Sequence, residues 1–79
     1  MKSVIIYSTP SCHFCHMAKD YFHEKGIAYT EFDVGADAEK RKEMVDMTKQ
    51  LGVPVIRIDD SLIVGFNKPK VMELLGLAD

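Results

Sequence analysis

Two cysteines lie three positions apart near the start of the chain, in the run Cys12-His13-Phe14-Cys15. Thiols at this spacing can close a disulfide with each other and so store and release two electrons. They can also bind a metal ion, and the longer run to His16 matches the C-x-x-C-H spacing at which haem is attached covalently. The spacing alone therefore admits redox, zinc and haem chemistry.

The position of the pair relative to a helix favours redox chemistry. Apolar residues recur at helical spacing directly after it, and we expect them to form the inner face of a helix: Phe14, Met17, Ala18, Tyr21 and Phe22. Cys12 then lies at or just before the first turn, where free N–H groups and the helix dipole lower the pKa of a thiol. A protonated His13 would lower it further. We predict that Cys12 attacks a substrate disulfide and that Cys15 resolves the mixed disulfide.

The other interpretations of the pair fit the rest of the sequence less well. Haem attachment normally takes place outside the cytosol, and no export segment is visible. A zinc site needs further ligands, yet there is no second cysteine pair, and His16 and His23 are interpreted as exposed helix residues. A permanent staple is disfavoured because so small a loop stabilises least. Two inert buried thiols remain the simplest alternative.

Length and composition indicate one small globular domain over residues 1–79. The chain has 47% hydrophobic residues, and 10 basic against 12 acidic side chains give a net charge of −2. This balance gives no reason to expect nucleic acid or a membrane surface as a partner. No stretch approaches the roughly 20 apolar residues of a membrane helix. We expect a cytoplasmic monomer.

Hydrophobic periodicity predicts seven elements in the order β-α-β-α-β-β-α. The first helix ends at Lys25-Gly26, Asp37 caps the second, whose inner face holds Met44, Met47, Thr48 and Leu51, and Gly52 stops it. Asn67 caps the last, with Val71, Leu74 and Leu75 inward and Gly76 at its end. The predicted strands cover residues 2–7, 28–34, 54–58 and 62–64. This order implies an α/β fold, with a parallel pair, an antiparallel hairpin and a four-stranded mixed sheet flanked by helices.

Three blocks of the sequence, in this order, resemble the glutaredoxins of the thioredoxin superfamily, and the small glutaredoxin-like redoxins most of all. They are the active-site segment 6–15, the loop 52–56 with a cis proline at Pro54, and the glycine turn 64–67. The resemblance implies a thioredoxin-like fold and a dithiol–disulfide oxidoreductase that carries electrons to protein disulfides without a bound cofactor. It implies substrate contacts from a set of residues around the cysteines: His13, Phe14, Val53, Pro54, Gly65, Phe66 and Asn67. Core packing remains an alternative for Phe14 and Phe66, and Tyr7 is predicted in the core.

The chain departs from the glutathione-using members at several positions. His13 replaces their usual proline, Thr9 stands where they often have a basic residue, and Gly52 precedes Val53 where they favour threonine. Asn67-Lys68 takes the place of their acidic pair. Either glutathione or a thioredoxin reductase therefore fits as the electron donor, and the Gly65-Phe66 pair is similar to redoxins that use the reductase and can serve ribonucleotide reductase.

A second class of function is a metal or iron–sulfur binding module that uses Cys12. The glutaredoxin family has members that bridge two chains through a cluster held by such thiolates. Those members usually have a single active-site cysteine, whereas this chain has two.

Overall fold

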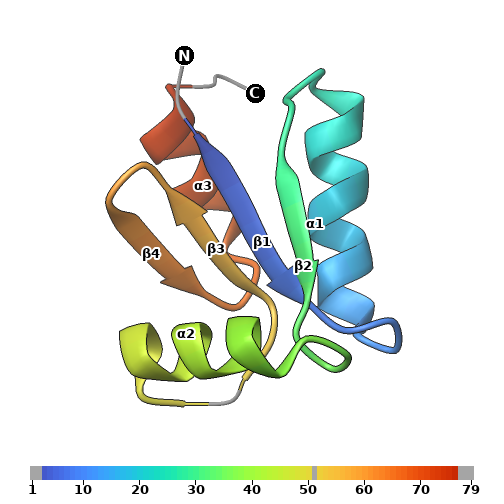
Figure 1. The fold of residues 1–79 in the computed structure, drawn as a ribbon. Helices are drawn as coiled ribbons and strands as arrows, with labels where there is room; N and C mark the ends of the chain where they lie inside the picture. Colours follow the sequence, from blue (N-terminus) through green and yellow to red (C-terminus); the bar gives the residue numbers. More distant parts are fainter. Residues whose placement is uncertain (1–2, 51, 77–79) are drawn as a thin grey trace.

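The computed structural model describes residues 3–50 and 52–76. Its elements follow the predicted order (Figure 1): β1 Val4–Ser8, α1 His13–Glu24, β2 Thr30–Asp33, α2 Ala38–Thr48, β3 Val55–Ile58, β4 Ser61–Val64 and α3 Lys68–Leu75. The predicted α/β class is therefore confirmed, and Lys2 lies outside the described residues.

The four strands form one mixed sheet in the order β2-β1-β3-β4. β1 pairs with β2 in parallel and β3 with β4 antiparallel, as the sequence predicts. The antiparallel pairing of β1 with β3, which joins the two halves of the sheet, was not predicted. These directions bring three distant segments to one edge of the sheet. They are the loop that follows β1, the segment that precedes β3 and the segment that follows β4.

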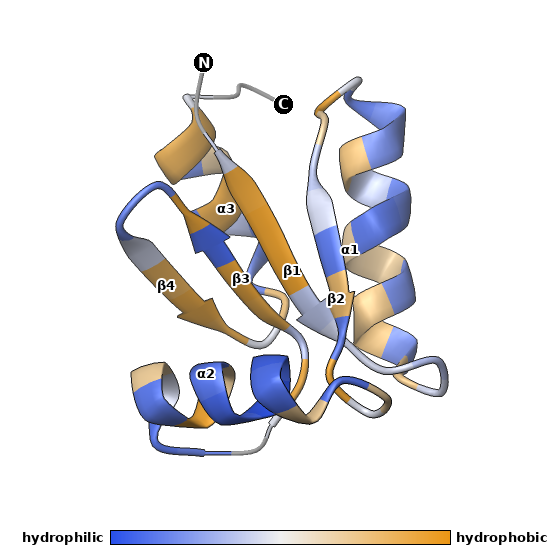
Figure 2. Ribbon diagram, in the orientation of Figure 1, coloured by the Kyte–Doolittle hydropathy of each residue, from blue (hydrophilic) through white to orange (hydrophobic). Residues whose placement is uncertain are grey.

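Helices cover both faces of the sheet because its central strands are apolar on both sides. α1 and α3 pack on one face, over a cluster that includes Ile6, Phe22, Ile56 and Val71. α2 packs on the other, where Tyr7, Val34, Met44 and Val55 are buried. Figure 2 shows β1 and β4 largely hydrophobic and α2 largely hydrophilic, with few hydrophobic positions. The fold therefore has two small cores, and the predicted burial of Tyr7 is confirmed.

The face that α1 buries differs from the predicted one. Ala18, Tyr21 and Phe22 are buried as predicted, but Phe14 and Met17 are 57% and 42% exposed. Cys15 is fully buried in their place. The buried positions 15, 18 and 22 recur at helical spacing, so the stripe that faces the sheet begins at Cys15 and not at Phe14.

The second helix ends earlier than predicted. Its N-cap is Asp37, as predicted, but its last residue is Thr48, and Lys49 takes a left-handed conformation with φ 62°. The Thr48 hydroxyl donates to the carbonyl of Met44 at 2.9 Å and so competes with the backbone ladder. The prediction that Gly52 stops this helix is therefore wrong, and Leu51 lies outside the described residues.

Candidate active site

A tight turn delivers Cys12 to the start of α1. The Cys12 N–H donates to the carbonyl of Thr9 at 3.2 Å, which closes the turn Thr9-Pro10-Ser11-Cys12. Cys12 has extended backbone angles and is the N-cap of α1, with its sulfur accepting the N–H of Cys15 at 3.1 Å. A sulfur thus occupies the place that a serine or aspartate oxygen usually takes at a helix start. The predicted position of Cys12 is confirmed.

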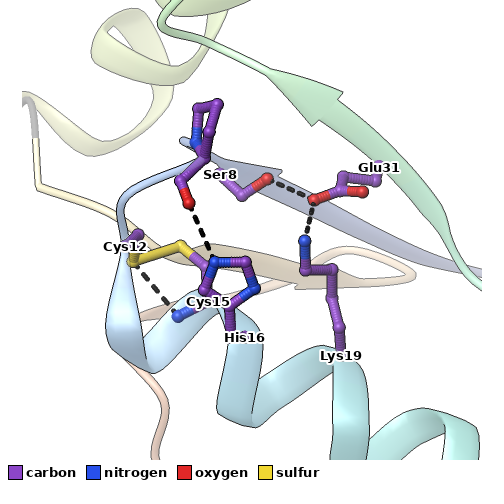
Figure 3. Close-up of a disulfide and its surroundings, with 7 residues drawn as sticks. Ser8, Cys12, Cys15, His16, Lys19 and Glu31 are labelled. Carbon is purple, nitrogen blue, oxygen red and sulfur yellow. Dashed lines mark hydrogen bonds and ion pairs between the residues drawn. A yellow bond between two sulfur atoms is a disulfide. The ribbon is translucent and has the colours of Figure 1, made fainter.

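The two cysteines differ in their exposure to solvent. They are joined by a disulfide, with their Cα atoms 5.2 Å apart (Figure 3). Cys12 is half-buried, whereas Cys15 is fully buried in the first turn of α1. A substrate can therefore approach Cys12 and not Cys15. When the bond is reduced, the Cys15 N–H is in place to stabilise a thiolate on Cys12.

The two residues between the cysteines face solvent. His13 and Phe14 are both exposed, and their rings meet edge to face with centroids 5.5 Å apart. Met17, one turn after Phe14, is also exposed. The side chain of Phe14 therefore lies on the surface beside the disulfide, and the alternative of core packing is excluded for it.

The cis peptide bond predicted before Pro54 is present. Pro54 is fully buried and Val53 is half-buried, directly before β3. Because Tyr7 pairs with Val55, Pro54 lies in register beside Ser8, at the end of β1 from which the cysteine loop leaves. The Pro54 carbonyl accepts the N–H of Gly65 at 2.7 Å, so the second and third sequence blocks are bonded to each other.

The third block turns the chain from β4 into α3. Gly65 has φ 86°, a conformation that favours glycine, and a Cβ there would meet no atom within 4 Å. Phe66 is half-buried against Tyr21 of α1, with ring centroids 5.9 Å apart. Asn67 is exposed and caps α3, its side-chain oxygen accepting the N–H of Lys70 at 3.3 Å. Phe66 therefore packs on the core, and the side-chain oxygen of Asn67 is hydrogen-bonded to the start of α3.

A polar cluster beside the disulfide was not predicted from the sequence. Ser8 is 1% exposed, and its hydroxyl donates to Glu31 Oε2 at 2.6 Å (Figure 3). Lys19 of α1 reaches the same oxygen at 2.8 Å. The hydrogen bonds from Lys19 and then Ser8 hold the pKa of Glu31 below its usual value, against a smaller opposing effect of burial. The cluster ties β1, β2 and α1 together below the cysteines.

A pocket of about 360 Å³ opens over this cluster, lined by Ser8, Lys19 and Glu31 together with Thr9, Pro10, His16 and Asp33. It lies beside the cysteine loop. The sequence signal was the alternation that places Glu31 and Asp33 on one face of their strand, but that signal does not say which helix covers the face.

Residues 3–50 and 52–76 contain no group of three or more His, Cys, Asp or Glu side chains that could hold a metal ion. In the same part of the chain, no helix is long and apolar enough to cross a membrane. His16 is exposed and bonded to the carbonyl of Pro10, and His23 is exposed near the other end of α1.

Comparisons with known proteins agree with this geometry. A family model described as Glutaredoxin matches residues 4–63. A glutaredoxin-like 8.6 kDa protein from the rubredoxin operon of Clostridium pasteurianum is 46% identical over 89% of this chain and 93% of its own. Glutaredoxin 3 of Escherichia coli K12 is 33% identical over 100% of this chain and 95% of its own. A crystal structure of a mutant of the thioredoxin-like protein BC3987 superposes with a TM-score of 0.90, at 31% identity, covering 99% of this chain and all of the other.

Proposed function

This chain belongs to the glutaredoxin family of thiol–disulfide oxidoreductases, and we propose that it reduces disulfides of protein substrates with Cys12 as nucleophile. The observation that carries the proposal is the difference between the two cysteines. Cys12 is half-buried and its sulfur faces an N–H donor at the helix start, whereas Cys15 is fully buried beside it. The first sulfur suits attack on a bulky disulfide and the second suits an internal attack.

The reaction proceeds by two exchanges of sulfur. The Cys12 thiolate attacks one sulfur of the substrate disulfide, and the other leaves as a thiolate that takes up a proton. Cys15 then loses its proton and attacks Cys12, which releases the second substrate thiol. The substrate gains two electrons and two protons, and the chain is left with the Cys12–Cys15 disulfide seen in the structure. The two sulfurs carry the electrons, so we propose that the reaction needs no bound cofactor.

The substrate contacts that we propose surround the accessible sulfur. His13 and Phe14 offer exposed rings beside Cys12. Val53 and Pro54 lie at the same edge of the sheet, where the backbone of Val53 can pair with an extended substrate segment. Gly65 is held beside them by the hydrogen bond from its N–H to the Pro54 carbonyl, and Asn67 lies two residues further along the chain. Phe66 packs on Tyr21 and is half-buried, and we propose that its exposed part contacts the substrate. We propose that the protein works as a cytoplasmic monomer on disulfide-containing proteins.

The electron donor that we propose is glutathione or a thioredoxin reductase. The segment after Gly65 favours the reductase, because Asn67 supplies no carboxylate for the glutathione amine and its side-chain oxygen already caps α3. Lys68 remains available for a carboxylate, and its ammonium lies over the Tyr21 ring, 5.3 Å from the centroid.

A coupled assay with two donors tests the proposal. Oxidised protein is offered glutathione with its reductase, or a thioredoxin reductase, each with NADPH, and the reduction of a protein disulfide is followed. We expect sustained turnover with at least one donor and none for Cys12→Ser. Failure of the unmodified protein with both donors would contradict the electron-carrier function.

A further inference from the structure

His16 has a side-chain contact that the proposed reaction does not use. It follows Cys15 directly, in the position that gave the sequence its resemblance to a haem-attachment motif. Its ring Nε2 lies 2.8 Å from the carbonyl oxygen of Pro10, in the loop that carries Cys12 (Figure 3). A carbonyl oxygen only accepts hydrogen bonds, so Nε2 must carry a proton. That holds for one neutral tautomer and for the imidazolium, so the bond does not depend on the charge of the ring.

The accepting carbonyl belongs to the central peptide of the turn Thr9-Pro10-Ser11-Cys12. The orientation of this peptide separates type I from type II turns, and type II needs a positive φ at the third residue. Ser11 is not among the described residues with positive φ. The central peptide therefore has the orientation that needs no positive φ, and the His16 ring is hydrogen-bonded to it in that orientation. Within the described residues, loss of this hydrogen bond would leave the bond from the Cys12 N–H to the Thr9 carbonyl to close the turn around the exposed Pro10 and Ser11.

The backbone of His16 bonds to the same segment from the other side. Its N–H donates to the carbonyl of Cys12 at 3.2 Å, as the first turn of α1 requires. His16 is thus bonded through its backbone to Cys12 and through its ring to Pro10. Between these two bonds, the Cys12 sulfur is aligned with the N–H of Cys15 at 3.1 Å.

We propose that His16 is a positioning residue, which fixes the turn so that the Cys12 thiolate receives the hydrogen bond of the Cys15 N–H. This inference rests on the nucleophilic role proposed for Cys12 and explains why a histidine follows the pair. The His16 ring bonds to the Pro10 carbonyl, so in this proposal it acts on Cys12 through the turn. Its effect is to hold the thiolate form of Cys12 in the environment that stabilises it.

Other charged groups near the ring must be kept constant in a test. The pocket that His16 lines also contains Lys19, Glu31 and Asp33. Lys19 and Glu31 are paired with each other, and Asp33 accepts the N–H groups of Gly35 and Ala36. Substitution of His16 leaves these hydrogen bonds in place, but it also removes the electrostatic effect of the ring on Glu31. A variant that keeps a donor and lacks the charge is therefore needed to assign a change in Cys12 reactivity to the bond with Pro10.

The alkylation rate of Cys12 tests the proposal. Iodoacetamide is reacted with the reduced Cys15→Ser protein between pH 4 and 9, so that Cys12 is the one thiol present. His16→Ala in this background should react about two- to tenfold more slowly below the midpoint of the profile, the scale set by one hydrogen bond, and the midpoint should rise. His16→Gln, whose side-chain amide can donate from a similar reach, should restore the parent rate to within about twofold. His23→Ala, an exposed histidine of the same helix, is the matched control and should not change the profile.

Two results would overturn the proposal. One is a His16→Ala profile that matches the parent, which would mean that the turn holds its shape without the ring. The other is His16→Gln reacting as slowly as His16→Ala, which would show that the imidazole acts by charge or bulk and not as a donor. The readout is the reactivity of Cys12 alone, so failure of disulfide turnover in the coupled assay would contradict the proposed function and leave this inference standing.

Discussion

At the scale of single residues, the site depends on the unequal surroundings of two chemically identical thiols. Cys12 caps a helix and is half-buried, whereas Cys15 is fully buried one turn later. Residue type and spacing were enough to predict this pair and its place at a helix start. The bonds Ser8–Glu31–Lys19 and His16–Pro10 could not be predicted, because they join residues from different elements whose register appears only in the fold.

The Glu31 carboxylate should make stability depend on pH in the acid range. Its pKa is lowered in the folded protein by Lys19 and Ser8, so the charged form favours folding. This contribution is fully present above the usual pKa of 4.5 and is lost as the pH falls through the lowered value. Glu31→Gln should lower the free energy of unfolding at pH 7 by at most about 1 kcal/mol, because the pair is partly open to solvent, and the difference from the parent should shrink as the pH falls through the lowered pKa.

Urea unfolding at a series of pH values measures this effect. Glu24→Gln is the matched control, since Glu24 is an exposed carboxylate at the end of α1 with no hydrogen bond or ion pair within the described part of the chain. A constant difference between Glu31→Gln and the parent from pH 7 to pH 3 would contradict the account of the Glu31 pKa.

At the scale of elements, the helix starts were easier to predict than the helix faces and ends. Asp37 and Asn67 cap α2 and α3 through their own side chains, a local effect that the sequence displays directly. The buried face of α1 was misplaced at Phe14 and Met17 because two neighbouring stripes both carry apolar residues. Which stripe faces the sheet is decided by packing, and the end of α2 by the hydroxyl of Thr48.

The left-handed end of α2 gives a prediction for stability. Lys49 has φ 62°, where a Cβ is unfavourable and glycine is not. Lys49→Gly should raise the free energy of unfolding by about 0.5–1 kcal/mol, which raises Tm by about 2–8 °C in a domain of this size. Lys49→Ala removes the same charge but keeps a Cβ, so its Tm should not rise. A lower Tm for Lys49→Gly, or an equal gain for Lys49→Ala, would show that the helix ends in another way.

At the scale of the whole molecule, strand directions bring together what the sequence separates. The cysteine loop follows β1, Pro54 precedes β3 and Gly65 follows β4, and the antiparallel pairings place all three at one edge of the sheet (Figure 1). The order of elements predicted the mixed sheet, and the resemblance of the three blocks implied that their residues lie around the cysteines, but the antiparallel pairing of β1 with β3 required the structure. The contacts of Phe66 with Tyr21 and of Pro54 with Gly65 required the structure, since they depend on how α3 and β4 approach that edge.

The most direct test of the central claim is to identify the sulfur that bonds to the substrate. Reduced Cys15→Ser is mixed with a disulfide-containing protein, and the product is mapped by mass spectrometry under non-reducing conditions. We predict a stable mixed disulfide on Cys12, because the thiol that would resolve it is missing, no accumulation of this species in the unmodified protein, and no adduct or turnover for Cys12→Ser. Cys12→Ser that still reduces the substrate, or that forms the mixed disulfide through Cys15, would contradict the assignment of Cys12 as nucleophile.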